Sequence, residues 1–323
     1  MNSVPLSANS IERRSVGAML ASAPGAAYLL TVLMLGFGIA NVGFFSAQNM
    51  SNIGLQSAVL LIVALGMTLV ILTEGIDLSL GPLLGLTGVI MGLLTVSGAP
   101  LAVALIVAVL AGVAVGSVNG TLISYVGMPP FIVTLGMFGI AQSLAMALTG
   151  GNSVTGLPSA IRWFNEGIWL GIPVPIWATA VLFGLTYVLL YRTKFGRYVF
   201  AIGGNRRALM LSGVPVRFYQ TLVYAYAGLL TALASFIMTA RMNAAHPTVA
   251  IGLEFDAIAA VILGGTAFER GRGGIWGTVI GAIAVSVLRN GLNLIGLGTE
   301  WQVAVVGLVI IGAVAVDAVR GRT

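Results

Sequence analysis

The chain has 323 residues, of which 58% are hydrophobic and 7% are charged, and its mean hydropathy is +1.05. Soluble domains carry about 25% charged residues, so this chain has too little polar surface to cover a soluble fold of its size. The composition therefore predicts an integral membrane protein, in which the net charge of +6 is typical of basic cytoplasmic loops and not of nucleic-acid binding. The absence of Cys and the single His246 exclude disulfides and thiolate or His-rich metal sites.

The N-terminal segment has two interpretations. Arg13 and Arg14 precede small residues, as in a cleaved signal peptide, but the apolar run continues to Phe45. Such a run is longer than the apolar core of a signal peptide. We therefore expect a cytoplasmic tail over 1–25 and a first membrane span that is retained.

Ten apolar segments are candidates for membrane-spanning helices. A spanning helix needs about 20 mostly apolar residues, and the eighth segment is shorter than this. The candidates are 26–45, 53–73, 78–97, 101–123, 130–149, 174–191, 219–241, 256–268, 275–294 and 301–317. Together they predict one transmembrane domain over 26–317 and a C-terminal tail over 318–323.

The distribution of basic residues among the loops tests the count of ten spans. Basic loop residues concentrate on the cytoplasmic side of a membrane protein, and an even number of spans separates each basic cluster from the next. All clusters are cytoplasmic only if the short segment 256–268 also crosses, so we expect ten spans with both termini cytoplasmic. The clusters are Arg13 and Arg14; Arg192, Lys194, Arg197, Arg206, Arg207 and Arg217; Arg270 and Arg272; and Arg320 and Arg322.

Glycines recur at helical spacing in several spans. Small residues four positions apart let helix backbones approach closely, and van der Waals contact then drives helix association in lipid. The pattern favours a compact helix bundle over a wide aqueous channel. The series are Gly81, Gly85, Gly88 and Gly92; Gly112, Gly116 and Gly120; and Gly273, Gly277 and Gly281.

Two acids lie between the second and third spans. Asp77 opens the sequence Asp-Leu-Ser-Leu-Gly-Pro, which is typical of a helix start because oxygen-bearing side chains accept bonds from free N–H groups. A carboxylate there also faces the positive end of the helix dipole. We expect Asp77 to cap the helix, with direct substrate contact as the alternative. Glu74 lacks such a capping sequence, and for it both roles, helix cap or pathway acid, stay open.

The segment 253–266 combines two acids with a short apolar run. Glu254 and Asp256 either cap the outer end of a helix, or the helix is broken and its free N–H groups face a translocation route. Both interpretations can hold together.

Amide side chains within or beside the spans are candidate contacts for an uncharged polar solute, because amides orient a ligand without adding charge. The alternative for each is an interhelical hydrogen bond. The candidates are Gln56, Asn119, Gln142, Asn290 and Asn293, and we expect His246 to make a contact in an outer loop.

Five segments together resemble the membrane subunit of ribose-type ATP-binding-cassette (ABC) sugar importers, in the superfamily of branched-chain amino acid and sugar permeases. They follow in order from about residue 50 to the C-terminus. They are EGIDLSLG at 74–81, MPPFIVTLG at 128–136, GRYVFAIGGNRRALMLSGVPV at 196–216, LEFDAIAAVILGGTAFERGRGGIWGTVIG at 253–281 and NGLNLIG at 290–296.

The resemblance implies an all-α, ten-helix permease of the type II importer architecture in a bacterial inner membrane. It implies a second permease, either another copy or a paralogue, two cytoplasmic ATPase domains and a periplasmic sugar-binding protein, which His246 would face. The ATP and Mg²⁺ would be bound by the ATPase, with no cofactor in this chain. The expected solute is a pentose-like monosaccharide; a nucleoside, a branched-chain amino acid or a furanone-type signal are alternatives.

The family places its ATPase-coupling segment after the sixth span, within 192–218 here. There the family tends to have Glu-Ala-Ala, three residues and Gly, whereas this chain has Arg207, Ala208, Leu209 and Gly213. A short amphipathic helix from about Asn205 to Leu211, closed by Gly213, is expected to dock in an ATPase groove, and a basic loop beside anionic lipid is the alternative. The expected contact residues are Asn205, Arg206, Arg207, Ala208, Leu209, Ser212 and Gly213.

ATP hydrolysis by the chain itself is excluded, because no phosphate-binding G-x-x-x-x-G-K-[ST] motif occurs and Lys194 is the only lysine. The span centres are nearly free of charge, which disfavours an ion-coupled carrier. A self-sufficient channel or carrier stays the alternative from another class. An intramembrane protease is disfavoured because Asp77 and Asp256 lie at span boundaries.

Overall fold

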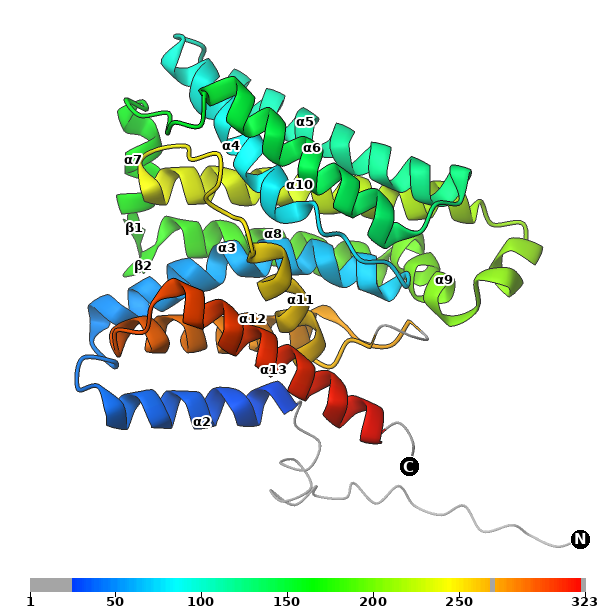
Figure 1. Ribbon diagram of the computed structural model, residues 1–323. Helices are drawn as coiled ribbons and strands as arrows, with labels where there is room; N and C mark the ends of the chain where they lie inside the picture. Colours follow the sequence, from blue (N-terminus) through cyan, green and yellow to red (C-terminus); the bar gives the residue numbers. More distant parts are fainter. Residues whose placement is uncertain (1–24, 268–270, 321–323) are drawn as a thin grey trace, which may run out of the picture.

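The computed structural model describes residues 25–267 and 271–320, and the chain there folds almost entirely into helices (Figure 1). In the described residues, two short strands, β1 (Ile168–Trp169) and β2 (Ile172–Pro173), pair as an antiparallel hairpin. The helices are α2 (Gly25–Ala40), α3 (Ala47–Leu72), α4 (Leu80–Val96), α5 (Leu101–Thr121) continued by the π-helical turn η1 (Leu122–Val126), α6 (Pro130–Thr149), α7 (Ser159–Glu166), α8 (Val174–Arg192), α9 (Lys194–Leu211), α10 (Val216–Met242), α11 (Leu253–Leu263), α12 (Ile275–Leu294) and α13 (Thr299–Arg320).

Each of the ten predicted spans coincides with one of these helices, but the helices differ in length. Among the described residues, six helices are long and apolar enough to cross a membrane: α3, α5 with η1, α6, α8, α10 and α12. Helices α2 and α4 and the described apolar part of α13 are shorter. At 1.5 Å per residue, the 11 residues of α11 span only about 16 Å of an apolar layer about 30 Å thick. Ten crossings and cytoplasmic termini therefore stay predictions.

At two places, which we call the broken passages, the chain turns back into the bundle as a non-helical segment before the next helix begins. After α3 the segment 73–79 turns back into the bundle before α4 begins, and 243–252 likewise leads from the end of α10 to α11 (Figure 1). The two helix starts meet, because a side chain at Gly81 in α4 would overlap Glu254 and lie 2.5 Å from the carbonyl oxygen of Ala250. Helix α11 thus starts against the start of α4, and whether its free N–H groups face a translocation route stays a prediction.

Glycine contacts hold the helices close together, as predicted. A Cβ at Gly112 of α5 would lie 2.5 Å from the carbonyl oxygen of Gly228 in α10, and one at Gly281 of α12 would overlap the backbone of α11 at Ala260. Helices α3 and α10 pass through the centre of the hydrophobic core, which contains Leu65, Leu69 and Tyr224. The bundle is therefore packed backbone to backbone at several crossings.

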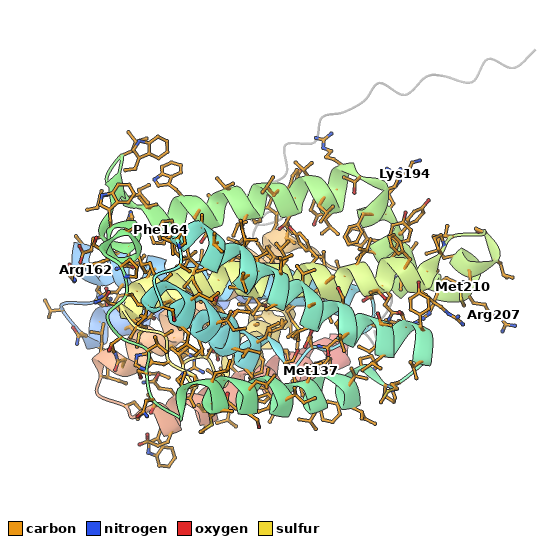
Figure 2. All side chains as sticks on the ribbon, turned by 90° about the horizontal axis from the view of Figure 1, so that it is seen from above. Met137, Arg162, Phe164, Lys194, Arg207 and Met210 are labelled. Atoms are coloured by element: carbon orange, nitrogen blue, oxygen red, sulfur yellow. The ribbon has the colours of Figure 1, made fainter. Side chains whose placement is uncertain are left out.

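Basic residues of the cluster between Arg192 and Arg217 lie at one end of the bundle (Figure 2). Helix α7 and the hairpin mark one end, and α9 marks the other (Figure 1); we call these the α7 end and the α9 end. Viewed from above, Arg162 lies at the α7 end, whereas Lys194 and Arg207 lie at the α9 end (Figure 2). The excess of basic residues predicts that the α9 end is cytoplasmic. Residues 1–24 with Arg13 and Arg14, residues 268–270 with Arg270, and residues 321–323 with Arg322 lie outside the described residues.

Candidate functional site

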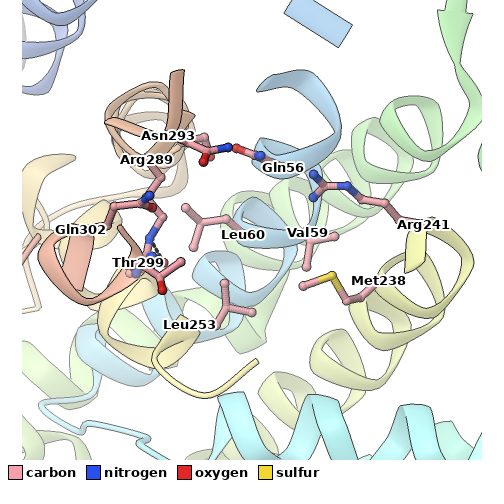
Figure 3. Close-up of a pocket in the computed structure, with 12 residues that line it drawn as sticks. Gln56, Val59, Leu60, Met238, Arg241, Leu253, Arg289, Asn293, Thr299 and Gln302 are labelled. Atoms are coloured by element: carbon pink, nitrogen blue, oxygen red, sulfur yellow. Dashed lines mark hydrogen bonds and ion pairs between the residues drawn. The ribbon is translucent and has the colours of Figure 1, made fainter. Parts of the chain in front are cut away.

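A polar cavity of about 280 Å³ lies between α3, α10, α11, α12 and α13 (Figure 3). Its position near the start of α3 and the end of α10 places it toward the α7 end. Its apolar lining is Val59, Leu60, Met238 and Leu253, and its polar lining is Gln56, Arg241, Asp256, Ser286, Arg289, Asn293, Thr299 and Gln302. A small-molecule site typically has about 300–1,000 Å³ and a few convergent polar groups, so this cavity suits a small polar solute.

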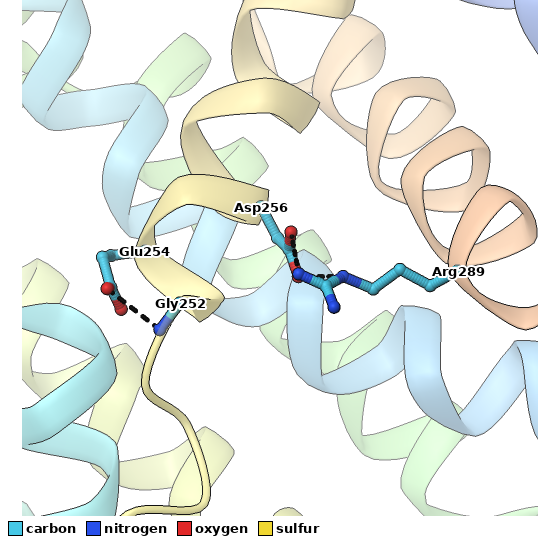
Figure 4. Close-up of polar contacts among 4 residues, drawn as sticks. All are labelled: Gly252, Glu254, Asp256 and Arg289. Carbon is cyan, nitrogen blue, oxygen red and sulfur yellow. Dashed lines mark hydrogen bonds and ion pairs between the residues drawn. The ribbon is translucent and has the colours of Figure 1, made fainter. Parts of the chain in front are cut away.

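The cavity contains an ion pair between α11 and α12. Arg289 Nε lies 2.6 Å from Asp256 Oδ2, and Arg289 Nη2 lies 2.7 Å from Asp256 Oδ1 (Figure 4). The Asp256 side chain is 6% exposed and that of Arg289 is 26% exposed. Asp256 lies in the first turn of α11, but among the described residues the partner of its carboxylate is Arg289 and not a backbone N–H of the helix start. A two-point guanidinium–carboxylate pair compensates for removing the acid from water.

A second guanidinium enters the cavity without a partner. Arg241 lies in the last turn of α10 and is half-buried, and its guanidinium has no hydrogen bond or ion pair to any residue that the structure describes. In Figure 3 it points into the cavity from the wall opposite Arg289 and Gln302. Because Asp256 neutralises only one of the two arginines, the lining has a formal charge of +1. Such a cavity presents mainly hydrogen-bond donors to a ligand.

The five predicted amides divide into two groups. Gln56 and Asn293 line the cavity. The other three make contacts within the bundle: Asn290 with Asn49 at 2.9–3.0 Å, Asn119 Nδ2 donating to Ser79 Oγ at 3.0 Å, and Gln142 Nε2 donating to the Pro247 carbonyl at 3.2 Å. Of these three, only the Asn290 bond joins two helices, as the alternative predicted, whereas Asn119 and Gln142 bond to residues between helices. A role of Gln56 and Asn293 in transport stays a prediction.

The acids of the first broken passage have different surroundings. Asp77 is 1% exposed, and its Oδ1 accepts bonds from the Ser79 backbone N–H at 2.9 Å and the Ser79 hydroxyl at 2.5 Å. Ser79 is the residue before α4. Asp77 therefore stabilises the turn that leads into the helix, and it does not accept a bond from a backbone amide in the first turn of the helix. Glu74 is exposed and has a left-handed backbone with φ of 61°.

Glu254 joins the two broken passages. Its side chain is buried, and Oε1 accepts a bond of 3.0 Å from the N–H of Gly252, the cap residue of α11 (Figure 4). The expected capping is therefore present for this acid, in the reach-back form of the capping box. Oε2 has no hydrogen-bond partner and lies against Gly81, at the start of α4.

The predicted coupling segment forms a short helix at the α9 end. Helix α9 is interrupted at Asn205, where φ is −158° and ψ is 83°, and Asn205 Oδ1 accepts a bond of 2.9 Å from the N–H of Ala208. Ser212 Oγ donates to the Ala208 carbonyl at 3.0 Å, and Gly213 has φ of +77°. The helical bounds expected at Asn205 and Leu211 thus match the structure; we call residues 205–213 the hook.

The hook exposes apolar side chains. Met210 is 48% exposed and Leu211 is 83% exposed, and Arg207 projects beside them at the extreme of the bundle (Figure 2). Leu209 and Arg206 are half-buried. At the other end of the molecule, His246 Nδ1 is hydrogen-bonded to the Ser153 hydroxyl, so the observed contact of His246 lies within the chain.

The sequence interpretation missed most of the cavity. Arg241 and Arg289 were not counted among the basic clusters, although both lie at the ends of spans that the topology places away from the cytoplasm. That exception to the positive-inside pattern is the signal that would have found them. Ser286, Thr299 and Gln302 have no comparable signal. Within the described residues, no group of three or more His, Cys, Asp or Glu side chains is arranged to hold a metal ion.

The apolar helices and the polar cavity define a multi-pass membrane protein of the permease class. Residues 49–314 match the family of the permease component of branched-chain amino acid transport systems, and the chain belongs to this family. The resemblance predicted from the sequence is confirmed.

Curated relatives match along most of their length. The ribose import permease of Bacillus subtilis (strain 168) is 42% identical over 290 residues, covering 89% of this chain and 90% of the relative. That of Escherichia coli (strain K12) is 41% identical over 292 residues, covering 89% and 91%. The D-allose transport system permease of the same strain is 36% identical over 295 residues, covering 91% and 90%. No solved structure matches the chain. With its apolar helices, the chain is a multi-pass protein of the bacterial inner membrane.

Proposed function

We propose that the chain is the permease subunit of an ABC importer and that it forms the translocation route for a monosaccharide of the ribose type. The observation that carries this proposal is the 41–42% identity to two ribose import permeases along about nine-tenths of both chains. The D-allose and fructose permeases among the relatives keep the proposed solute within the monosaccharides. The chain supplies the route, and a separate subunit supplies ATP hydrolysis, because the sequence has no phosphate-binding loop.

The hook is the proposed contact with the ATPase. Met210 and Leu211 are exposed on a helix that protrudes from the bundle at its basic end, where lipid does not cover them if that end is cytoplasmic. A short capped helix with an exposed apolar side is a suitable rigid element for a groove in a partner. The Asn205 cap and the positive φ of Gly213 hold both ends of this helix.

The proposed assembly has two permeases, two cytoplasmic ATPase domains and a periplasmic sugar-binding protein. Gln56 and Asn293 are the proposed pathway residues of this chain. ATP binding would draw the two hooks together and change which end of the route is open. The departures from the family pattern at Arg207 and Leu209 predict that the partner groove differs at the positions these residues face.

Transport in membrane vesicles tests the proposal. The chain is co-expressed with an ATPase subunit and a sugar-binding protein from the same organism, and uptake of labelled D-ribose, D-allose, D-fructose, uridine and leucine is measured with and without ATP. We expect ATP-dependent uptake of a monosaccharide that requires the binding protein. Uptake of leucine or uridine alone would contradict the sugar assignment, and flux through the purified chain alone in liposomes would favour a channel or carrier.

A single-cysteine assay tests the topology. Because the natural chain has no cysteine, Ser212→Cys reports the side on which the hook lies, and Ser97→Cys at the opposite end is its matched control. We expect an impermeant thiol reagent added to intact cells with a permeabilised outer membrane to label only the control. Labelling of Ser212→Cys from the periplasm would overturn the coupling role of the hook.

A further inference from the structure

The cavity described above lies within one chain, although transport routes in dimeric permeases can also run between chains. Its lining comes from five helices of this chain, and its two guanidinium groups enter from opposite walls (Figure 3). The inference below rests on the proposed sugar-permease function, because it assigns a ligand class to this cavity.

Some polar side chains of the cavity have hydrogen-bond partners within the chain, and others have none. Asp256 and Arg289 satisfy one another, and Gln302 donates its amide N–H to the Leu297 carbonyl at 2.9 Å. The side chains of Gln56, Asn293 and Arg241 have no hydrogen bond to any residue that the structure describes. A half-buried guanidinium without an acceptor is unfavourable, since burying a charge costs free energy unless it is paired or hydrogen-bonded. Solvent or a ligand with acceptor oxygens must therefore satisfy Arg241.

The residue types fit a ring that bears several hydroxyl groups. A hydroxyl both donates and accepts, so a sugar can accept from Arg241, donate to the Asp256 carboxylate and exchange both kinds of bond with Gln56 and Asn293. The apolar wall formed by Val59, Leu60 and Met238 suits the C–H face of the same ring. The volume of about 280 Å³ leaves room for one small ring.

We infer that this cavity is a monosaccharide-binding site contained within a single permease chain, with Arg241 and the Asp256–Arg289 pair contacting hydroxyl oxygens from opposite walls. The permease then contributes to sugar selectivity itself and does not only pass on what a binding protein delivers. Asp256 lies in the first turn of α11, so an occupied site also bridges α11 to α10 across the cavity.

Cysteine protection tests this inference with the purified full chain in lipid nanodiscs. Ser286→Cys places a thiol in the cavity wall at almost the same volume, Thr299→Cys places one at its exposed rim, and Ser97→Cys lies outside it. Methyl methanethiosulfonate is small and uncharged, so its rate of reaction reports access and not charge. Bound ligand slows labelling by the factor 1 + [L]/Kd, which is about tenfold at nine times Kd.

We expect D-ribose, D-allose or D-fructose to slow labelling of Ser286→Cys or Thr299→Cys and to leave Ser97→Cys unchanged. Adding Arg241→Met should abolish the protection, whereas Arg241→Lys, which keeps a cationic donor, should retain part of it. The labelling rate of Ser97→Cys in each Arg241 variant serves as the folding control.

The uptake experiment separates the failure of the cavity assignment from the failure of the proposed sugar-permease function. If a monosaccharide is taken up with its partners but protects neither cavity cysteine, the site is wrong and the proposed function stands. If no monosaccharide is taken up and leucine or uridine protects the cavity, both are wrong. Protection that survives Arg241→Met would also overturn the assignment of this site.

Discussion

Breaking the Asp256–Arg289 pair should destabilise the bundle, and the loss should be larger when the arginine is removed than when the acid is removed. Arg289→Met leaves the Asp256 carboxylate, 6% exposed in the present pair, without its cation. Removing one partner of a buried pair typically costs about 3–5 kcal/mol. Because the Arg289 side chain is itself 26% exposed, water reaches part of the site, and we expect a cost near the lower end, about 3 kcal/mol.

The opposite single change should cost less. Asp256→Asn keeps the volume and one acceptor and leaves Arg289 partly hydrated, so the loss is that of a charged hydrogen bond, about 1.5–3 kcal/mol. In the double variant neither charge is left unpaired. The double variant should therefore be more stable than the sum of the single losses predicts, with an interaction free energy of about 1–3 kcal/mol.

The assay is thermal unfolding of the four purified proteins in one detergent, followed by tryptophan fluorescence. We expect the midpoint to fall most for Arg289→Met, less for Asp256→Asn, and to recover partly in the double variant. Additive losses in the double variant would refute the reasoning, because they would mean that the two side chains do not depend on one another.

Three further changes test other contacts. Gly81→Ala should lower the unfolding midpoint because the added methyl overlaps the buried carboxylate of Glu254; combining it with Glu254→Ala should restore part of the loss, and an unchanged midpoint in Gly81→Ala would contradict the meeting of the two broken passages. Gly116→Val should prevent α5 from packing on the backbone of α10, whereas Gly136→Val on the open side of α6 should be tolerated; equal yields of folded protein for both would contradict the backbone-to-backbone packing. Asn205→Ala removes the cap of the hook and should fray this protruding helix locally, at a cost of about 1 kcal/mol to that helix alone. Sugar-stimulated ATP hydrolysis by the assembled importer should fall while the unfolding midpoint of the isolated bundle stays unchanged. Asn205→Asp, which keeps the capping oxygen, should retain activity.

Much of the helical layout was predictable because membrane insertion makes the length and polarity of each apolar run decisive. All ten predicted spans coincide with helices, and the short helix of the hook was expected from Asn205 and Gly213. The close approach of α5 to α10 followed from glycine spacing, because only a missing side chain allows backbones to touch.

The cavity was not predictable in the same way. Gln56 and Asn293 were found because an amide within an apolar span is conspicuous in any sequence. Asn290 looked identical to Asn293 in the sequence, yet it pairs with Asn49, which is 241 positions away. The pairing of two amides depends on how α3 and α12 are rotated against one another, and no local pattern records that rotation.

Composition, run length and the placement of arginines by themselves determined a helical membrane bundle with a basic end. Only the tertiary structure decided that Asp256 pairs with Arg289, that Arg241 is left without a partner beside them, and that two helices start inside the bundle. The physical reason is that hydrophobicity and charge act on each segment separately, whereas an ion pair, a cavity or the meeting of two helix ends requires side chains from distant segments to reach the same few ångströms.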